Sequence, residues 1–135
     1  MISSTAEYAL RAIVYLAQHS RNGRVAAADV ASTLGIPANY LGKILHELAR
    51  SGVLNSTRGK LGGFSLAEPP DEIPLSRVVA LFDDIGNGSK CLLGRPECSD
   101  VHPCAAHARW KVVSDQVNRF FHETTVGDLL SDGKH

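Results

Sequence analysis

The sequence predicts a mainly α-helical protein with a small β wing. Three observations predict this fold class. Apolar residues recur at helical spacing through about the first fifty residues. A glycine-rich turn then separates two strand-like runs, and another amphipathic helix follows the three cysteines. We therefore expect a winged helix-turn-helix DNA-binding domain over residues 1–67, and a cluster-binding loop with a long dimerisation helix over residues 68–135.

The length of 135 residues suits one domain with an appended helix that needs a partner to cover it. No run approaches the roughly 18 apolar residues of a membrane span, and no basic region followed by an apolar run marks a secretion signal. The cysteine count is three, which argues against a disulfide framework in a reducing compartment. We expect a cytoplasmic protein with no membrane partner.

The net charge is zero, but the charges are segregated along the chain. Residues 1–67 carry seven Lys and Arg against three acids, a balance of +4. Residues 68–135 carry seven against eleven, a balance of −4. Such asymmetry is typical of a protein whose basic half faces the phosphates of nucleic acid.

The first predicted helix begins near Ser3-Ser4-Thr5, which offers an N-cap, and stops at Asn22-Gly23. Its apolar residues recur at helical spacing: Tyr8, Ala9, Ala12, Ile13, Leu16 and Ala17. Glu7 lies in its first turn, four residues before Arg11, so its default role is a surface ion pair.

A helix-turn-helix follows over residues 25–52. A short helix is predicted from Val25 to Leu34, Gly35-Ile36-Pro37 makes a tight turn, and Pro37 suits the start of a third helix. The third helix buries a stripe formed by Leu41, Ile44, Leu45 and Leu48. Its N-terminal residues are expected to enter the DNA major groove, and the candidates are Ala38, Asn39, Tyr40, Gly42 and Lys43.

The next segment reads as a β-hairpin. Strand-like runs over residues 53–58 and 64–66 are joined by a glycine-rich turn over residues 59–63. A hairpin directly after a helix-turn-helix is a wing. Arg58 and Lys60 lie at its tip, where we expect them to contact the DNA backbone or minor groove.

The second part of the chain begins at the rigid break Glu68-Pro69-Pro70-Asp71. A fourth helix of about three turns is predicted around residues 75–82. A long helix after the cysteines carries an apolar seam made of Ala106, Trp110, Val113, Val117 and Phe120. We expect this seam to form a homodimer, whose two-fold axis would match a pseudo-palindromic operator. Thr125 and Asp128 predict a capping box for a short last helix.

All three cysteines lie in the pattern Cys91-x6-Cys98-x5-Cys104-x2-His107. Three thiolates and an imidazole are donors that suit an iron–sulfur cluster or zinc. The gaps are wider than those of most zinc sites, which favours the larger cluster. Metal-free redox thiols are the other open reading. Pro103 suits a first helical position, so we expect Cys104 in the first turn of the long helix.

Taken together, the residues resemble the Rrf2 family of bacterial regulators, the family of IscR and NsrR. The matching residues are Tyr8-Ala9-Leu10, Gly35-Ile36-Pro37 with Tyr40-Leu41, Gly52-Val53-Leu54, Arg58-Gly59-x-x-Gly62-Gly63-Phe64, Cys98-x5-Cys104-x2-His107-x2-Trp110 and Thr125-Val126-Gly127-Asp128-Leu129. They span almost the whole chain, and the wing and the cysteine loop are the specific parts.

The resemblance implies a dimeric transcription factor that binds double-stranded DNA and carries a 2Fe-2S or 4Fe-4S cluster. IscR-like members hold a two-iron cluster through three cysteines and a histidine, which correspond to Cys91, Cys98, Cys104 and His107. NsrR-like members replace the histidine with an acidic residue from the first helix of the other subunit, and Glu7 corresponds to it. The cluster would report cluster supply, nitric oxide or redox state by changing operator affinity.

Two features depart from the IscR pattern. The first cysteine gap is six residues instead of five, and Gly42 stands where IscR carries an acidic residue that reads bases. The competing hypotheses are a winged-helix regulator that senses through zinc or metal-free thiols, and a small electron-transfer or thiol enzyme. The second is disfavoured because no Ser/His/Asp or Cys/His catalytic arrangement is evident.

Overall fold

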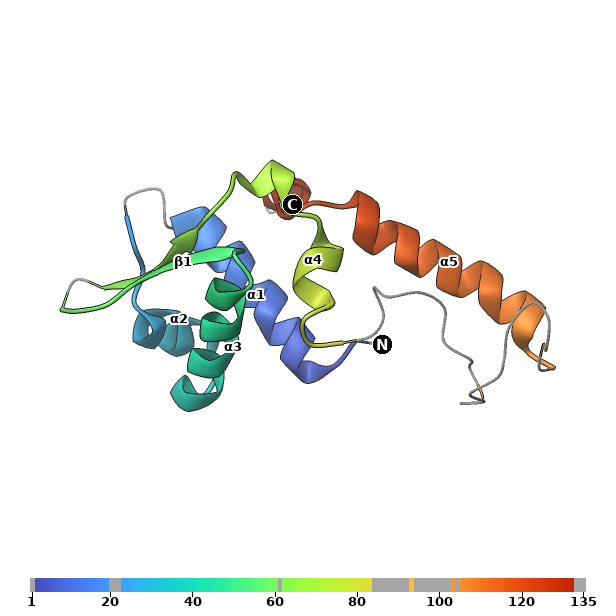
Figure 1. Ribbon diagram of the computed structural model, residues 1–135, viewed down its shortest axis with the longest axis horizontal. Coiled ribbons are helices and arrows are strands. Elements are labelled where there is room, and N and C mark those ends of the chain that lie inside the picture. The colour runs from blue at the N-terminus through green and yellow to red at the C-terminus, as the bar shows by residue number, and fades with distance from the viewer. Residues whose placement is uncertain are drawn as a thin grey trace.

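The computed structural model describes residues 2–19, 23–60, 62–83, 93, 103 and 105–132, and Figure 1 shows their arrangement. Its elements in order are α1 (Ser4–His19), α2 (Ala27–Leu34), α3 (Ala38–Arg50), β1 (Leu54–Thr57), β2 (Gly63–Leu66), the 3₁₀ turn η2 (Pro70–Glu72), α4 (Leu75–Val79), α5 (His107–Glu123) and α6 (Val126–Asp132). The mainly helical class with one two-stranded antiparallel sheet is confirmed.

Helix α1 lies at the centre of the core. The predicted cap is Ser3, whose hydroxyl oxygen accepts a hydrogen bond of 3.1 Å from the Ala6 amide. One face of the helix is buried: Ala6, Ala9, Ala12, Ile13, Leu16 and Ala17. Helices α2, α3, α4 and α6 and strand β2 all pack on α1, so this face organises both parts of the chain.

Helices α2 and α3 form the predicted helix-turn-helix. Gly35 ends α2 in the left-handed region with φ of 70°, a conformation that favours glycine. The Ile36 amide then donates to the Ala31 carbonyl at 3.1 Å, which closes the turn. Helix α3 buries the predicted stripe of Leu41, Ile44, Leu45 and Leu48 against α1 and α2.

Strands β1 and β2 form the predicted wing, with Leu54 opposite Leu66 and Thr57 opposite Gly63. Val25 pairs with Phe64 through amide-to-carbonyl bonds of 3.0 and 2.8 Å, as an isolated bridge beside β2. The prediction that the second helix includes Val25 is therefore wrong. Val25 is β-branched and satisfies its backbone groups against the wing, and α2 begins two residues later at Ala27.

The segment after the wing returns to the same core. Ile73, Leu75, Val78 and Val79 are buried together with Val126. The Leu75 amide donates to the Thr124 carbonyl and the Val126 amide to the Ile73 carbonyl, both at 2.8 Å. The division at residue 67 stays a prediction.

The predicted capping box is confirmed, because the Thr125 amide donates to Asp128 Oδ2 at 2.9 Å and the Asp128 amide to Thr125 Oγ1 at 3.2 Å. Helix α4 is shorter than the three turns expected. After Val79 the chain tightens into three-residue bonds, with the Phe82 amide donating to the Val79 carbonyl at 3.0 Å.

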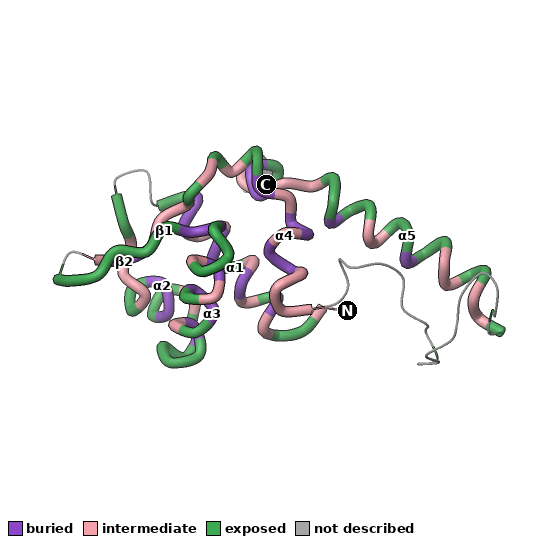
Figure 2. The backbone as a smooth tube through the Cα atoms, in the orientation of Figure 1, coloured by how far each residue is buried: buried purple, intermediate pink, exposed green. Residues whose placement is uncertain are grey.

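Helix α5 projects from the rest of the fold as a long rod, as Figure 1 shows. Figure 2 shows that most of its residues are exposed or half-buried, whereas Phe121 near its C-terminal end belongs to the core. The helix begins at His107, so the prediction that Pro103 is its first residue is wrong; Ala105 and Ala106 form a turn before it. Among the described residues, no helix is long and apolar enough to cross a membrane.

A Gly63→Ala substitution is expected to destabilise the fold by about 1 to 3 kcal/mol, because overpacking against a backbone forces a shift. A Cβ at this position would lie 2.5 Å from the Val25 carbonyl oxygen. Chemical denaturation measures the change. Gly42→Ala is the matched control and should lose no stability, because a Cβ there would meet no heavy atom of the described residues within 4 Å, helix backbone aside. Equal stability of the Gly63→Ala variant and wild type would contradict the packing of Val25 on the wing.

Candidate nucleic-acid interface

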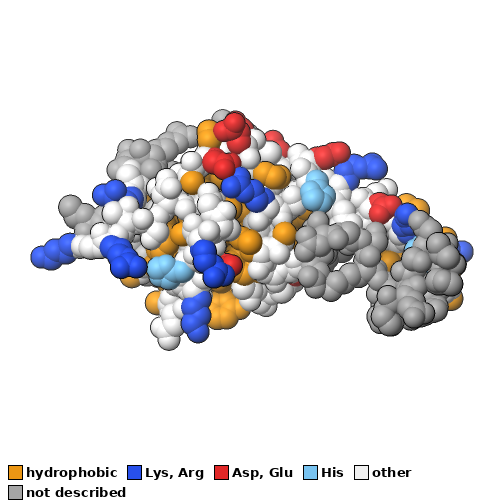
Figure 3. All heavy atoms as spheres, viewed as in Figure 1, with side chains coloured by type: hydrophobic (Ala, Val, Ile, Leu, Met, Phe, Trp, Pro, Cys, Tyr) orange, Lys and Arg blue, Asp and Glu red, His pale blue; other side chains and the backbone are white. Residues whose placement is uncertain are grey.

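The first turns of α3 present the predicted DNA-reading residues to solvent. Ala38, Asn39, Tyr40 and Lys43 are exposed and Gly42 is half-exposed. Figure 3 shows Lys and Arg side chains gathered over the part of the molecule formed by α3 and the wing. This surface has the exposed polar groups and the positive charge that recognition of a DNA groove requires.

Gly42 has no role in packing that the described residues reveal. A Cβ built on it would meet no heavy atom within 4 Å there, leaving aside the backbone of α3 itself. Glycine inside a helix costs roughly 1 kcal/mol relative to alanine. The open space in front of Gly42 would let another molecule approach the α3 backbone closely.

Tyr40 is held in place by α1. Its hydroxyl hydrogen-bonds with that of Thr5, and its ring meets the Tyr8 ring edge to face, with centroids 5.6 Å apart and planes at 88°. The Arg11 guanidinium lies 5.9 Å from the centroid of the Tyr8 ring and donates to the Leu34 carbonyl at 2.9 Å. The start of α3 is therefore positioned by a helix distant in sequence, which periodicity did not predict.

The wing places Arg58 and Lys60 at the exposed tip of its hairpin. Gly59 adopts φ of 104°, and the Gly62 amide donates to its carbonyl at 3.0 Å, which closes the tight turn. A side chain at Gly62 would overlap the Thr57 carbonyl oxygen. Glycines thus keep the hairpin narrow at the point where two cations project.

Two further residues of α3 extend this surface, and the predicted DNA-binding set did not include them. His46 and Arg50 are exposed and follow Asn39 and Lys43 at helical spacing of three and four residues, a signal already present in the sequence. The His46 ring packs edge to face on Phe64 of β2, with centroids 5.5 Å apart. This contact joins the exposed face of α3 to the wing.

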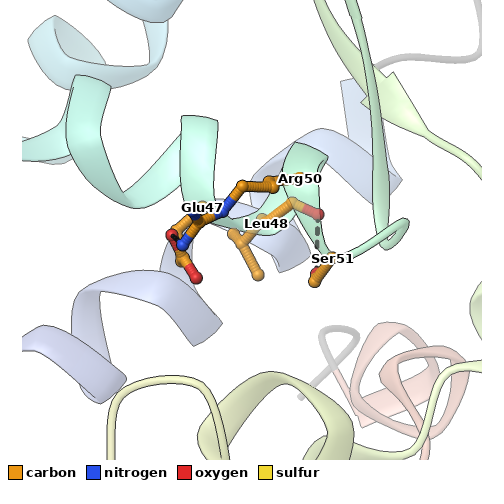
Figure 4. A network of polar contacts seen from close by, with 4 residues as sticks. All are labelled: Glu47, Leu48, Arg50 and Ser51. Carbon is orange, nitrogen blue, oxygen red and sulfur yellow. Dashed lines mark hydrogen bonds and ion pairs between the residues drawn. The ribbon is translucent and has the colours of Figure 1, made fainter.

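The C-terminal turn of α3 is closed by polar contacts, shown in Figure 4. Arg50 Nη2 donates to Glu47 Oε2 at 2.6 Å, and the Ser51 hydroxyl donates to the Leu48 carbonyl at 2.8 Å. The hydrogen bond and charge of Glu47 raise the pKa of Arg50. Because Glu47 partly neutralises it, Arg50 contributes less positive potential than Lys43.

The predicted metal ligands are placed only in part. Cys91, Cys98 and Cys104 lie outside the described residues. His107 is half-buried as the first residue of α5, and Glu7 is exposed in the first turn of α1. Within the described ranges, no group of three or more His, Cys, Asp or Glu could hold a metal ion. The ligand set therefore stays a prediction.

A helix-turn-helix with an exposed second helix, followed directly by a two-stranded wing, defines a winged helix-turn-helix protein. A family model supports this class, because Rrf2, described as an iron-dependent transcriptional regulator, matches residues 2–132. The chain belongs to the Rrf2 family of transcriptional regulators. The family resemblance expected from the sequence is confirmed.

Curated relatives cover the whole chain. A putative HTH-type transcriptional regulator of Aquifex aeolicus is 38% identical, over 100% of this chain and 95% of its own length. The HTH-type transcriptional regulator IscR of Photobacterium profundum is 31% identical, over 97% of this chain and 76% of its own length. Both relatives are named as transcriptional regulators and not as enzymes.

Solved structures share the fold. CymR (YrzC), the global cysteine regulator of B. subtilis, matches with a TM-score of 0.82 and 24% identity, covering 98% of this chain and 97% of its own. T. potens IscR matches with a TM-score of 0.77 and 23% identity, covering 98% and 88%. The winged-helix fold class is therefore confirmed, and it is shared by regulators with different names.

Gly42→Ala is expected to change stability and DNA affinity in opposite directions. Alanine should raise the free energy of unfolding by about 0.5 to 1 kcal/mol, because it removes the cost of glycine in a helix. It should weaken DNA binding, because the added methyl stands where the groove would approach the backbone. Denaturation measures stability and fluorescence anisotropy measures DNA affinity. The control is Ser32→Ala, at an exposed position of α2. Undiminished DNA affinity would contradict close approach at Gly42.

Proposed function

We propose that this chain is a homodimeric transcription regulator whose affinity for a pseudo-palindromic operator is controlled by an iron–sulfur cluster. The observation that carries the DNA-binding part is the exposed positive surface shared by α3 and the wing. The regulatory part is supported by the cysteine pattern and by membership of a family described as iron-dependent. A DNA-binding regulator works beside the chromosome, in the cytoplasm.

The DNA contacts divide by residue chemistry. Asn39 can pair with adenine through its amide, and Lys43 can donate to guanine or to a phosphate. The Tyr40 hydroxyl shares one hydrogen bond with Thr5, and it could donate a second hydrogen bond to a phosphate oxygen when Thr5 is the donor of the first. Arg58 and Lys60 would contact the sugar-phosphate backbone or the minor groove from the wing tip.

A homodimer is supported by the apolar surface of α5. Val112, Val113 and Phe120 are 60%, 45% and 51% exposed, which is unusual for large apolar side chains on one helix of a monomer. Val113 and Phe120 belong to the seam predicted from the sequence, whereas neighbouring Phe121 turns into the core at 6% exposure. A second α5 would cover this seam and bring two winged helices under a two-fold axis.

The donor set fits an iron–sulfur cluster. Cys91, Cys98 and Cys104 would supply three thiolates, and His107 or Glu7 a fourth donor of nitrogen or oxygen type. The bound cluster would supply chemistry that responds to redox state, nitric oxide or iron supply. His107 begins α5, so a ligand bond there would fix the start of the dimer helix relative to the three cysteines.

Two competing functions are consistent with the same sequence. A regulator that responds through zinc or metal-free thiols would use the same three cysteines, and the oxidized form of Staphylococcus aureus CymR shares the fold with a TM-score of 0.75. The wing would have no function in a small electron-transfer or thiol enzyme. Metal analysis separates the first function from the cluster, and salt-dependent duplex binding disfavours the second.

Removing one wing cation should weaken DNA binding and its salt dependence together. Each phosphate contact contributes about 0.9 to the slope of log affinity against log salt concentration. Arg58→Ala and Lys60→Ala should each lower that slope by about this amount, on a duplex selected by the wild-type protein from a random pool. Arg119→Ala on α5 removes the same charge far from the wing and serves as control. Equal slopes for all variants would contradict the wing contact.

Cys98→Ala is expected to abolish cluster binding, because the two remaining cysteines cannot supply the three thiolate ligands that the proposed cluster needs. Protein reconstituted anaerobically with iron and sulfide should show visible absorbance that the variant loses, with iron and sulfide counts falling in parallel. Ser99→Ala is the neighbouring control. His107→Ala and Glu7→Gln then identify the fourth ligand by which of them changes the spectrum. A colourless wild-type protein that binds no iron would refute the cluster.

Phe120→Asp should convert the dimer into a monomer. An unpaired carboxylate in an apolar interface costs about 3 kcal/mol or more, a hundredfold or greater weakening of association. Analytical ultracentrifugation measures the change. Asn118→Asp adds the same charge outside the predicted seam and should leave the dimer intact. A monomeric wild-type protein, or a variant that still forms a dimer, would contradict the seam.

A further inference from the structure

The start of α1 is fastened to the end of the segment that leads into the cysteines. The Ser3 amide donates to Asp83 Oδ2 at 2.6 Å, and the Ser3 hydroxyl donates to the Phe82 carbonyl at 3.3 Å. The same hydroxyl accepts from the Ala6 amide, so Ser3 is at once the cap of α1 and the anchor of residues 82 and 83. Cys91 follows Asp83 by eight residues in the sequence.

One turn further along, α1 contacts the recognition helix. The Thr5 hydroxyl bonds to that of Tyr40, in the first turn of α3, and the Tyr8 ring meets the Tyr40 ring edge to face. Tyr40 is 40% exposed, which places it at the border between the α1 contact and the proposed DNA surface. Asp83 and Tyr40 thus both contact the first two turns of the same helix.

We propose that these two turns transmit the state of the cysteine segment to the recognition helix within one subunit. The link consists of Asp83, Ser3, Thr5, Tyr8 and Tyr40, and it rests on the proposed regulatory function. Asp83 is a positioning residue, because it holds the start of α1 and would act on the DNA surface only through that helix.

The packing and exposure of these contacts would let the link respond to a displacement of residue 83. The buried Ala6, Ala9 and Ala12 keep α1 a rigid body against its neighbours. The Asp83 carboxylate accepts at the positive end of the α1 dipole, which favours the bond. The contact is exposed to solvent, so a rearrangement of the following chain can break it at modest cost. Loss of the anchor would loosen the start of α1 ahead of the buried Ala6, and with it the Thr5 contact that orients Tyr40.

The experiment compares operator affinity of cluster-loaded and metal-free full-length protein, on a duplex selected by wild type from a random pool. The link predicts that Asp83→Ala and Thr5→Val each bring the loaded-to-free affinity ratio about fivefold closer to one, the equivalent of one hydrogen bond of about 1 kcal/mol. The double variant should bring it no closer, because both residues lie on one link. Thr33→Val is the control. It removes an α2 hydroxyl that lies 3.5 Å from the Tyr15 hydroxyl, at a hydrogen bond with a different part of α1. Where the wild-type ratio differs from one, unchanged ratios in both test variants would overturn the link.

A second measurement tests this link independently of the proposed cluster function. In metal-free protein, Asp83→Ala should speed hydrogen exchange of the Leu41 amide, which donates to the Pro37 carbonyl at 2.9 Å in the first turn of α3. Thr33→Val should leave that rate unchanged. A wild-type ratio of one with faster exchange in the variant would reject cluster control and retain the link. Unchanged exchange at Leu41 would overturn the link whatever the ratio.

Discussion

The fold depends on close packing around one face of α1. Ala6, Ala9 and Ala12 are fully buried and present small side chains, so neighbouring elements approach the helix backbone closely. Ile13 and Leu16 continue that face with larger side chains. Because α2, α3, β2, α4 and α6 all pack on this helix, the reading surface and the C-terminal segment are held by the same body.

This arrangement separates the two roles of the chain. Helix α3 and the wing carry exposed cations on one part of the molecule. The part of α5 that precedes Phe121 projects from the core and exposes an apolar seam. The positive and negative halves of the sequence follow the same division. The proposed DNA contact and the proposed subunit contact therefore use different surfaces. In the proposed dimer, a change at the start of α5 would alter the spacing of the two recognition helices without contacting either one.

Local signals in the sequence predicted the fold well. The caps at Ser3 and Thr125, the Gly35 turn and the wing are encoded within a few residues, and each is confirmed. Contacts distant in sequence were not predictable: Val25 pairs with the wing, and Tyr40 is held by α1. The α3 surface was found by periodicity, and the same periodicity includes His46, whereas the contact of His46 with Phe64 on the wing has no local signal. Ligation by the cysteines remains a prediction, since no local pattern determines the metal.

The central claim is that α3 and the wing, carried by α1, form the DNA-reading surface of a regulator. Hydrogen–deuterium exchange of the protein, with and without a duplex selected from a random pool, tests it most directly. The account predicts that DNA slows exchange over residues 38–43 and 58–60 and leaves the exposed middle of α5 unchanged. Slower exchange over α5 and α6, with α3 and the wing unaffected, would contradict it.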